Sequence, residues 1–224
     1  KTAGTVLPAV TPVSMRTLLA DTEPANPARR VIRSMTAQLA ASRTAYVGPD
    51  LSHRRTLLTE VLRARQVRNM VRQEAREKNL PLRQVMHEAR EMFEEIAADY
   101  SHNLVRFSER FLRRLWTRIY DGLEVAHAET LTAIAAGNEL VYVPCHRSTM
   151  DDLLVPYAVY TRGFAVPHIA AGINLNLPIL GPILRKGGAF FLRRSFRGSP
   201  LYTAVFMNYL GAIMARGHPI QYFI

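Results

Sequence analysis

The sequence is poor in cysteine, with Cys145 the only one among 224 residues. A single thiol cannot form a disulfide within the chain, which is consistent with a reducing compartment. Packing and hydrogen bonds must then hold the fold together. Hydrophobic residues make up 48% of the chain, enough for a sizeable core, and this excludes a disordered chain.

Acidic residues are scarce in the second part of the chain. Residues 141–224 contain eight Lys and Arg but only two acids, Asp151 and Asp152. Residues 1–140 contain 21 Lys and Arg and 16 Asp and Glu. The formal net charge is +11. A basic balance favours anionic partners, such as a phosphorylated substrate, an acidic carrier protein, an anionic bilayer or nucleic acid. The one remaining carboxylate pair is expected to serve a function.

Long uninterrupted hydrophobic runs are also absent. The longest stretch without charge, residues 163–184, could reach across a bilayer, but prolines and asparagines interrupt it (Pro167, Asn174, Asn176, Pro178 and Pro182). Such residues break a helix or need hydrogen-bond partners, so we expect no spanning helix there. No secretory signal is visible. Because the chain opens on Lys1 and closes within an apolar segment, we expect it to be a fragment.

Residues 1–137 are predicted to form a mainly helical region with an irregular, proline-containing lead-in over residues 1–28. Apolar residues recur at helical spacing in four later stretches. These stretches begin near Leu57, Pro81, Asn103 and Leu123. We expect them to be antiparallel helices.

From residue 138 onward, short apolar stretches alternate with helical ones. Strands are predicted at Glu139–Cys145, Phe164–Ala170, Ala189–Leu192 and Ile220–Ile224, with helices near 149–161 and 200–216. Such alternation is typical of an α/β layer. The predicted fold class is α/β: a helical N-terminal region, then residues 138–224 as the N-terminal part of an α/β domain. Its sheet is expected to be mixed, largely parallel and truncated at the C-terminal end.

The densest chemistry lies where the first predicted strand meets the next helix. His146 ends the strand and Asp151 falls in the first helical turn, so a tight turn can bring the carboxylate to the imidazole. This pairing would fix the tautomer and make the other nitrogen a base for a hydroxyl proton. Two structural alternatives remain. Ser148 and Asp151 have the spacing of a capping box, and a lone histidine at a strand end is often structural.

Cys145 precedes His146 but is not predicted to be a nucleophile. Neighbours on a strand point to opposite faces, so if His146 faces a cleft, Cys145 faces the core. We therefore expect a buried apolar cysteine. His146, Asp151 and Asp152 could ligate a metal, but no supporting helical histidine or cysteine-pair spacing occurs, and we predict no metal site.

A basic cluster flanks the third predicted strand. Arg185 and Lys186 precede a Gly-Gly pair, and Arg193 and Arg194 follow the strand, at the end where α/β folds bind ligands. A guanidinium offers paired donors in a plane that suits phosphate. A solvated basic loop explains the cluster equally well, and no nucleotide-binding glycine motif occurs.

Together these stretches resemble the glycerolipid acyltransferase family, most closely its bacterial glycerol-3-phosphate (PlsB-type) subgroup. Residues 146–151, His-Arg-Ser-Thr-Met-Asp, look like the family's His-x-x-x-x-Asp motif, and residues 188–194, Gly-Ala-Phe-Phe-Leu-Arg-Arg, look like its second motif. Residues 167–176 also resemble this subgroup. The third motif should begin near Phe223, so most of it lies beyond Ile224, and this stretch alone is expected to be inactive.

The resemblance implies transfer of a fatty acyl chain from acyl carrier protein or coenzyme A to the sn-1 hydroxyl of glycerol 3-phosphate. The product would be lysophosphatidate, in the first step of phospholipid synthesis. His146 would be the general base and Asp151 its orienting partner. The substrate phosphate would contact basic residues of the cluster, namely Arg193, Arg194 and, more weakly, Lys186 and Arg185. No cofactor is implied besides the acyl donor.

The resemblance also implies a peripheral or monotopic place on the cytoplasmic face of the bacterial inner membrane. A basic surface suits an anionic membrane. The apolar residues of 175–184, followed by two basic residues, fit a membrane-dipping edge with a basic rim. They fit a core-facing loop and helix equally well.

Two other functions remain open. A related acyltransferase could use another acceptor, such as lysophosphatidate, although the long helical region argues against the small single-domain members. A non-catalytic basic module could bind acidic lipid or nucleic acid. Aromatic residues are not interleaved with the basic ones in a base-stacking pattern, so we predict no nucleic acid partner.

Overall fold

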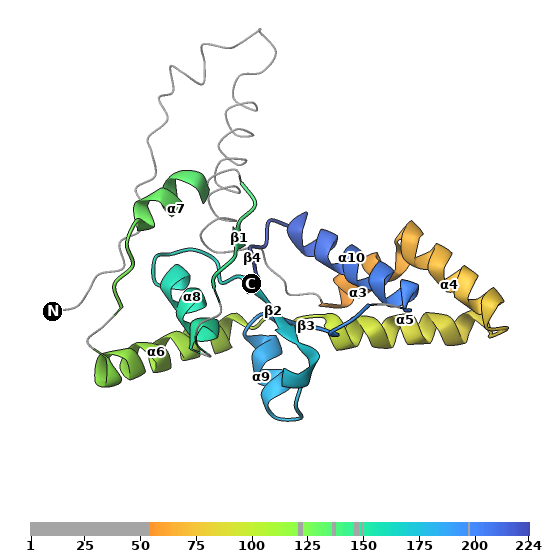
Figure 1. The fold of residues 1–224 in the computed structure, drawn as a ribbon, viewed down its shortest axis with the longest axis horizontal. Helices are drawn as coiled ribbons and strands as arrows, with labels where there is room; N and C mark the ends of the chain where they lie inside the picture. Colours follow the sequence, from red (N-terminus) through yellow and green to blue (C-terminus); the bar gives the residue numbers. More distant parts are fainter. Residues whose placement is uncertain (1–53, 121–122, 136–137, 146–147, 149, 197) are drawn as a thin grey trace, which may run out of the picture.

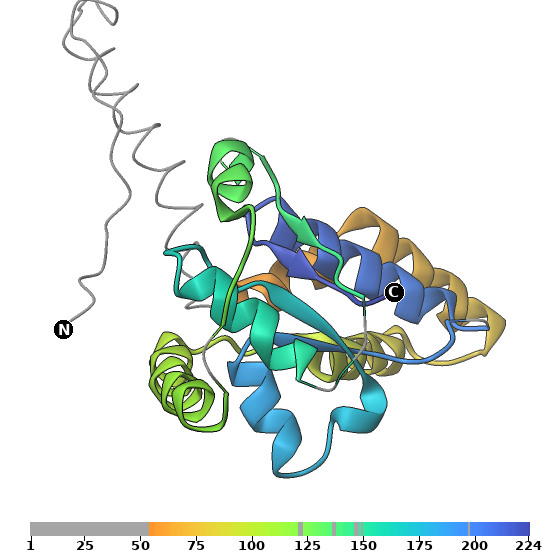
Figure 2. The same cartoon turned by 60° about the vertical axis from the view of Figure 1, so that its left-hand side comes forward.

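The computed structural model describes residues 54–120, 123–135, 138–145, 148, 150–196 and 198–224. The predicted lead-in over residues 1–28 and the predicted base His146 lie outside the described residues. Figures 1 and 2 show helices packed around one small sheet. None of the described helices is long and apolar enough to cross a membrane.

The first part of the described chain is helical, as predicted. Its helices are α3 (Arg54–Arg63), α4 (Arg65–Glu77), α5 (Leu82–Ile96), α6 (His102–Ile119) and α7 (Ala128–Ala135). The stretch predicted from Leu57 holds two helices, because Ala64 leaves the helical region with a ψ of 136°. Helix α7 begins later than the predicted Leu123, and His127 adopts a positive φ of 57° immediately before it.

Helix α5 illustrates how the sequence forms these elements. Pro81 lies directly before the helix, where its missing N–H costs no helical hydrogen bond. Val85, Ala89, Phe93 and Ile96 recur every three or four residues and are completely buried. This one apolar face fixes the helix against the rest of the molecule.

The four strands form one sheet in the order β1-β4-β2-β3. They are β1 (Val141–Tyr142), β2 (His168–Gly172), β3 (Ala189–Leu192) and β4 (Ile220–Gln221). All pairings are parallel, so within the described residues the sheet predicted as mixed is wholly parallel. β3 has the predicted bounds. β1 and β4 are shorter than predicted because they pair with each other over only two residues.

Helices cover both faces of this sheet. Helix α10 (Pro200–Met214) packs with α3, α4 and α5 on the face that carries Phe190 and Ile220. Helix α8 (Asp151–Tyr160) and α7 pack on the other face, against Tyr142. A short helix η1 (Ile173–Leu175) and α9 (Leu180–Lys186) connect β2 to β3.

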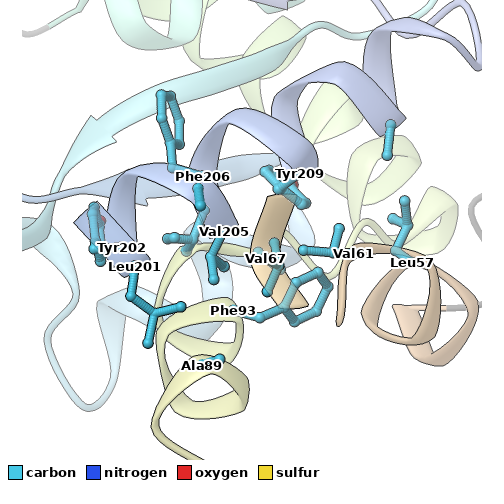
Figure 3. Close-up of a cluster of buried hydrophobic side chains, with 14 of the residues drawn as sticks. Leu57, Val61, Val67, Ala89, Phe93, Leu201, Tyr202, Val205, Phe206 and Tyr209 are labelled. Carbon is cyan, nitrogen blue, oxygen red and sulfur yellow. The ribbon is translucent and has the colours of Figure 1, made fainter. Parts of the chain in front are cut away.

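The larger hydrophobic core joins the first helices to the sheet (Figure 3). Phe93 of α5 meets Tyr209 of α10 edge to face, with ring centroids 5.8 Å apart. The Tyr209 hydroxyl accepts a hydrogen bond from the Ala98 N–H at 3.0 Å, which satisfies its polar atom inside the core. Helices from both sides of residue 137 thus share one core. The division into regions 1–137 and 138–224 stays a prediction.

Candidate active site

Of the predicted site residues, Asp151 and Arg193 follow strands and so approach one edge of the sheet, whereas Arg185 and Lys186 precede β3, at its amino end. Because the strands are parallel, their carboxyl ends meet at this edge, where α/β folds commonly bind ligands. The segment after β1 leads to Asp151, and Arg193 directly follows β3. β1 and β3 are the outer strands, three strand spacings apart, or roughly 14 Å. A ligand that touches both segments must therefore reach across the sheet edge.

Asp151 lies at the first position of α8, and its carboxylate turns back toward the preceding segment. Its Oδ2 accepts a hydrogen bond from the Ser148 N–H at 2.8 Å. The Ser148 hydroxyl in turn accepts the Met150 N–H at 3.1 Å. The predicted capping box is therefore half formed, since the serine hydroxyl binds the N–H of Met150 rather than that of Asp151. The positive end of the helix dipole also stabilises the negative charge of this carboxylate.

The segment between β1 and α8 carries one corrected prediction. Cys145 is exposed, so the prediction of a buried cysteine was wrong. The alternation argument fails because β1 already ends at Tyr142, which leaves Cys145 outside the strand. His146, Arg147 and Thr149 lie outside the described residues, so the assignment of His146 as the base stays a prediction.

Arg193 is engaged in a bidentate ion pair. Its Nε and Nη2 donate to the two carboxylate oxygens of Glu95, each at 2.7 Å. The guanidinium also lies over the ring of Tyr202, 4.5 Å from the centroid. The hydrogen bond to Glu95 raises the pKa of Arg193. This arginine is therefore held against α5 and α10.

Arg185 is likewise engaged with the end of α5. Its guanidinium donates to the backbone carbonyls of Ala97 and Glu95, both at 2.6 Å, and lies over the ring of Phe191. Burial lowers the pKa of Arg185, although an arginine stays charged at neutral pH. Glu95 lies in the last turn of α5 and Ala97 caps its C-terminal end, where cations are favoured.

The other two predicted basic residues are accessible. Lys186 and Arg194 are both exposed, and neither side chain forms an ion pair with another residue of the described chain. Of the four basic residues, these two are therefore available to an anionic ligand. The four do not converge on one point.

A mainly apolar cavity of about 290 Å³ lies beside the first turns of α8. Side chains from α6, α8, η1 and α9 line it, among them Leu104, Leu153, Pro156, Leu175 and Ile183. Asp152 also lines it, directly next to Asp151. The volume is near the lower end of small-molecule pockets, about 300 Å³. The apolar cavity and the carboxylate-bearing start of α8 are thus adjacent.

Two histidines are buried away from this edge. His168 is the first residue of β2, at the amino end of the strand, and its ring centroid lies 5.0 Å from that of His218. Burial, followed by the neighbouring His218, lowers the pKa of His168 to about 3, and burial and then Arg216 lower that of His218 to about 4. Both histidines are therefore neutral at physiological pH and are not acid–base groups of the site.

Comparisons with known proteins show which proteins this chain is similar to. Residues 123–224 match the acyltransferase family. A glycerol-3-phosphate acyltransferase of Pseudomonas putida is 47% identical over 196 residues, which is 88% of this chain and 24% of that protein. Proteins of the same name from Pseudomonas syringae pathovar tomato and Ectopseudomonas mendocina are 47% and 42% identical, over 81% and 96% of this chain and 22% and 26% of theirs.

This chain is a homologue of the glycerol-3-phosphate acyltransferases. The resemblance found in its motifs is thereby confirmed. The homologous chain spans about a quarter of the length of the curated relatives it matches.

The acyltransferase match begins before α7 and contains every predicted site residue. Glu95, which holds Arg193, lies outside it, in α5. Sequence reasoning missed Glu95 for this reason: it is 98 residues from Arg193, and a single glutamate within a helix carries no signal of its own.

Proposed function

We propose that this chain carries part of the active site of a glycerol-3-phosphate acyltransferase. The enzyme transfers a fatty acyl group from acyl carrier protein or coenzyme A to the sn-1 hydroxyl of glycerol 3-phosphate, and the product is lysophosphatidate. The proposal concerns the whole protein, of which this chain provides the His-Asp segment and the basic cluster. Homology to proteins of that name supports it.

In the proposed reaction His146 removes the proton of the sn-1 hydroxyl as its oxygen attacks the thioester carbonyl. The new carbon–oxygen bond forms, the carbon–sulfur bond breaks, and the thiolate leaves with the proton that His146 carried. Asp151 holds the imidazole in the required tautomer and stabilises its charged form. The step requires no covalent acyl-enzyme.

The observation that carries this proposal is the direction of the Asp151 carboxylate. It lies in the first turn of α8 and accepts the N–H of Ser148, two residues after His146. A carboxylate that merely neutralised the helix dipole could point along the solvent face. This one is directed at the segment that contains the proposed base, where an orienting partner has to lie, and the same hydrogen bond forms half of the capping box.

The apolar cavity suits the acyl chain of the donor. It is lined mainly by aliphatic and aromatic side chains of α6, α8 and α9, and it reaches the first turn of α8 through Asp152 and Leu153. A chain in this cavity would bring its thioester end near Asp151. Burial of each methylene group contributes about 0.8 kcal/mol, so the cavity would favour long acyl chains over short ones.

Binding of the substrate phosphate is assigned to the basic cluster, in which Arg194 is exposed after the carboxyl end of β3 and Lys186 is exposed before its amino end. A guanidinium can donate two parallel hydrogen bonds to a phosphate, whereas an ammonium acts as a point charge. We therefore expect Arg194 to contribute more specificity than Lys186. Arg185 and Arg193 remain candidates by motif, although their guanidinium groups are engaged with α5.

A membrane surface is the proposed place of action. Large apolar side chains are exposed on the elements that line the cavity, including Ile179 (82%), Phe107 (65%), Phe111 (59%) and Ile183 (50%), and Ile183 itself lines it. They belong to α6, α9 and the turn before α9, which lie on one side of the molecule (Figure 1). Exposed apolar residues beside arginines of α6 suit the interface of an anionic bilayer.

Vesicle flotation tests this membrane proposal. Replacing Ile179 and Ile183 by serine should reduce binding to vesicles with 30% anionic lipid, because two exposed apolar anchors are lost. Leu82→Ser is the matched control, since Leu82 is 55% exposed but lies at the far end of α5. Equal binding by the double variant and the control would contradict the assignment of this surface.

Acyl transfer tests the proposed function. Full-length protein is incubated with labelled palmitoyl thioester and glycerol 3-phosphate, as wild type and as His146→Ala. Loss of a general base typically lowers the rate about 10²–10⁴-fold. Unimpaired transfer by the variant would refute the base assignment. If the wild type acylates lysophosphatidate instead, the assignment of glycerol 3-phosphate as the acceptor is refuted.

A further inference from the structure

One residue of α5 binds both ends of the β3 segment. Arg185, before β3, donates its Nη2 to the backbone carbonyl of Glu95 at 2.6 Å. Arg193, directly after β3, donates Nε and Nη2 to the carboxylate of the same residue at 2.7 Å. The seven-residue segment between the two arginines contains the whole strand and is thus fastened to α5 at both of its ends.

Arg193 is restrained on three sides. Glu95 occupies one edge of its guanidinium, and the ring of Tyr202 covers one face at 4.5 Å. Its backbone N–H donates to the Tyr202 hydroxyl at 3.3 Å. A bidentate carboxylate neutralises the arginine and fixes its orientation. These contacts suit a fixed structural anchor better than a group that must meet a substrate.

The next residue has the opposite environment. Arg194 is exposed, and its side chain makes no ion pair with any residue that the structure describes. The two adjacent arginines of the motif therefore differ: the first is held by the protein, and the second faces solvent at the carboxyl end of β3. Fixing Arg193 also fixes the backbone from which Arg194 projects.

We propose that Glu95 is a positioning residue for substrate binding, acting through Arg193 to present Arg194 to the phosphate of glycerol 3-phosphate. This inference rests on the proposed function. It assigns different tasks to the two arginines and gives α5, outside the matched acyltransferase region, a part in the site. An anchored segment binds more tightly because less side-chain freedom is lost when the ligand arrives.

Calorimetric binding of glycerol 3-phosphate to the full-length protein, together with steady-state kinetics, tests the proposal. Glu95→Gln removes the charge but keeps the shape, and we expect Kd and KM to rise about tenfold. The value of kcat should stay within about threefold, since the reacting groups are untouched. If Glu95→Gln does not fold, Glu95→Asp keeps the charge with a shorter reach and should weaken binding in the same direction.

Glu94→Gln is the matched control. Glu94 precedes Glu95 on the same helix and pairs with Arg54 at 2.7 Å, so its substitution breaks an ion pair of similar length that does not involve β3. We expect Kd and KM to stay within about twofold of wild type. An equal rise in both variants would overturn the positioning role, because it would reflect general weakening of α5.

A double-mutant cycle separates positioning from direct contact. If Glu95 acts through Arg193, then Arg193→Gln and the double variant should weaken binding by the same factor of about ten as Glu95→Gln. The proposal would be overturned if the affinity losses of the two single variants multiplied in the double variant. A much larger loss from Arg193→Gln, or tighter binding by Glu95→Gln, would overturn it too.

Failure of the wild type to transfer acyl groups would count against the proposed function, whereas unchanged binding in Glu95→Gln counts against the positioning role alone.

Discussion

The two faces of the sheet are packed very differently. On one face, α3, α4, α5 and α10 enclose a large cluster of buried side chains around Phe93 and Tyr209 (Figure 3). On the other face, the buried cluster beneath α7 and α8 consists of Ala135, Val159 and Phe164. The His-Asp segment leads into α8, on this second face. The packed face and the proposed His-Asp segment thus lie on opposite sides of one small sheet.

This difference suggests a division of labour. Densely packed regions open rarely, whereas regions with few buried apolar contacts open at low free-energy cost and often carry ligand-binding segments. The packed face also supplies Glu95, which anchors Arg193. The proposed site therefore draws its rigid part from the helical region and its adjustable part from the α8 side.

The largest expected effect comes from creating a cavity in the packed face. Phe93→Ala should lower the free energy of unfolding by about 3–5 kcal/mol, because it removes a fully buried ring and leaves a cavity. Phe164→Ala on the other face should cost less, since its partly exposed neighbours can relax into the space. Urea unfolding measures both. Equal losses would show that the two faces are equally rigid.

Acid should weaken the centre of the sheet next. His168 and His218 have pKa values of about 3 and 4 in the folded protein, below the ordinary 6.5. The unfolded chain therefore takes up protons first, and stability falls as pH drops below 6.5 toward the folded values. Between pH 7.5 and 5.5 we expect a loss of about 1.4 kcal/mol per histidine. Urea unfolding at both pH values measures this drop in the free energy of unfolding. The drop should be smaller in His168→Gln than in the wild type, and an equal drop would exclude His168 as its source.

At the start of α8, stability and activity should separate. Asp151→Asn removes a charge from the positive end of the helix, which should cost about 0.3–1 kcal/mol. Acyl transfer should fall by about 10²-fold or more if Asp151 orients the base. Thermal melting and the palmitoyl transfer assay measure the two effects. A variant with nearly full activity would leave Asp151 with only a capping role.

The smallest effect is expected from an ion pair on the packed face. Arg216 and Glu60 meet at 2.6 Å, but both side chains are substantially exposed. Glu60→Gln should therefore cost at most about 1 kcal/mol, and the cost should shrink in 1 M salt. A larger or salt-independent loss would mean that this pair contributes to packing as well as to charge balance.

Much of the architecture was predictable because it depends on local patterns. The buried strand Ala189–Leu192 is bounded by glycines and arginines, and its predicted bounds are confirmed. The apolar spacing of α5 likewise appears as its buried face. β1 and β4 were predicted too long, because strand length depends on a partner that periodicity does not reveal.

The site was less predictable because its contacts join distant segments. The motif resemblance selected Asp151, and its backward-turned carboxylate agrees with the predicted tight turn. The same reasoning failed for Cys145, which lies past the end of its short strand. It treated Arg193 and Arg194 alike. Only the tertiary structure brings Glu95 to Arg193 and distinguishes the two arginines.

The strand order has a consequence for how the site is assembled. Among the described strands, β1 pairs only with β4, whose residues follow it by 79 positions, Val141 with Ile220. Contacts between such distant residues form late, because a long loop must close first. During synthesis at the ribosome, β1 and the His-Asp segment must wait for β4 to emerge, whereas β2 and β3 can already pair. The strand that leads into the first motif is thus translated before its only described partner and joins the sheet after β4 has been made.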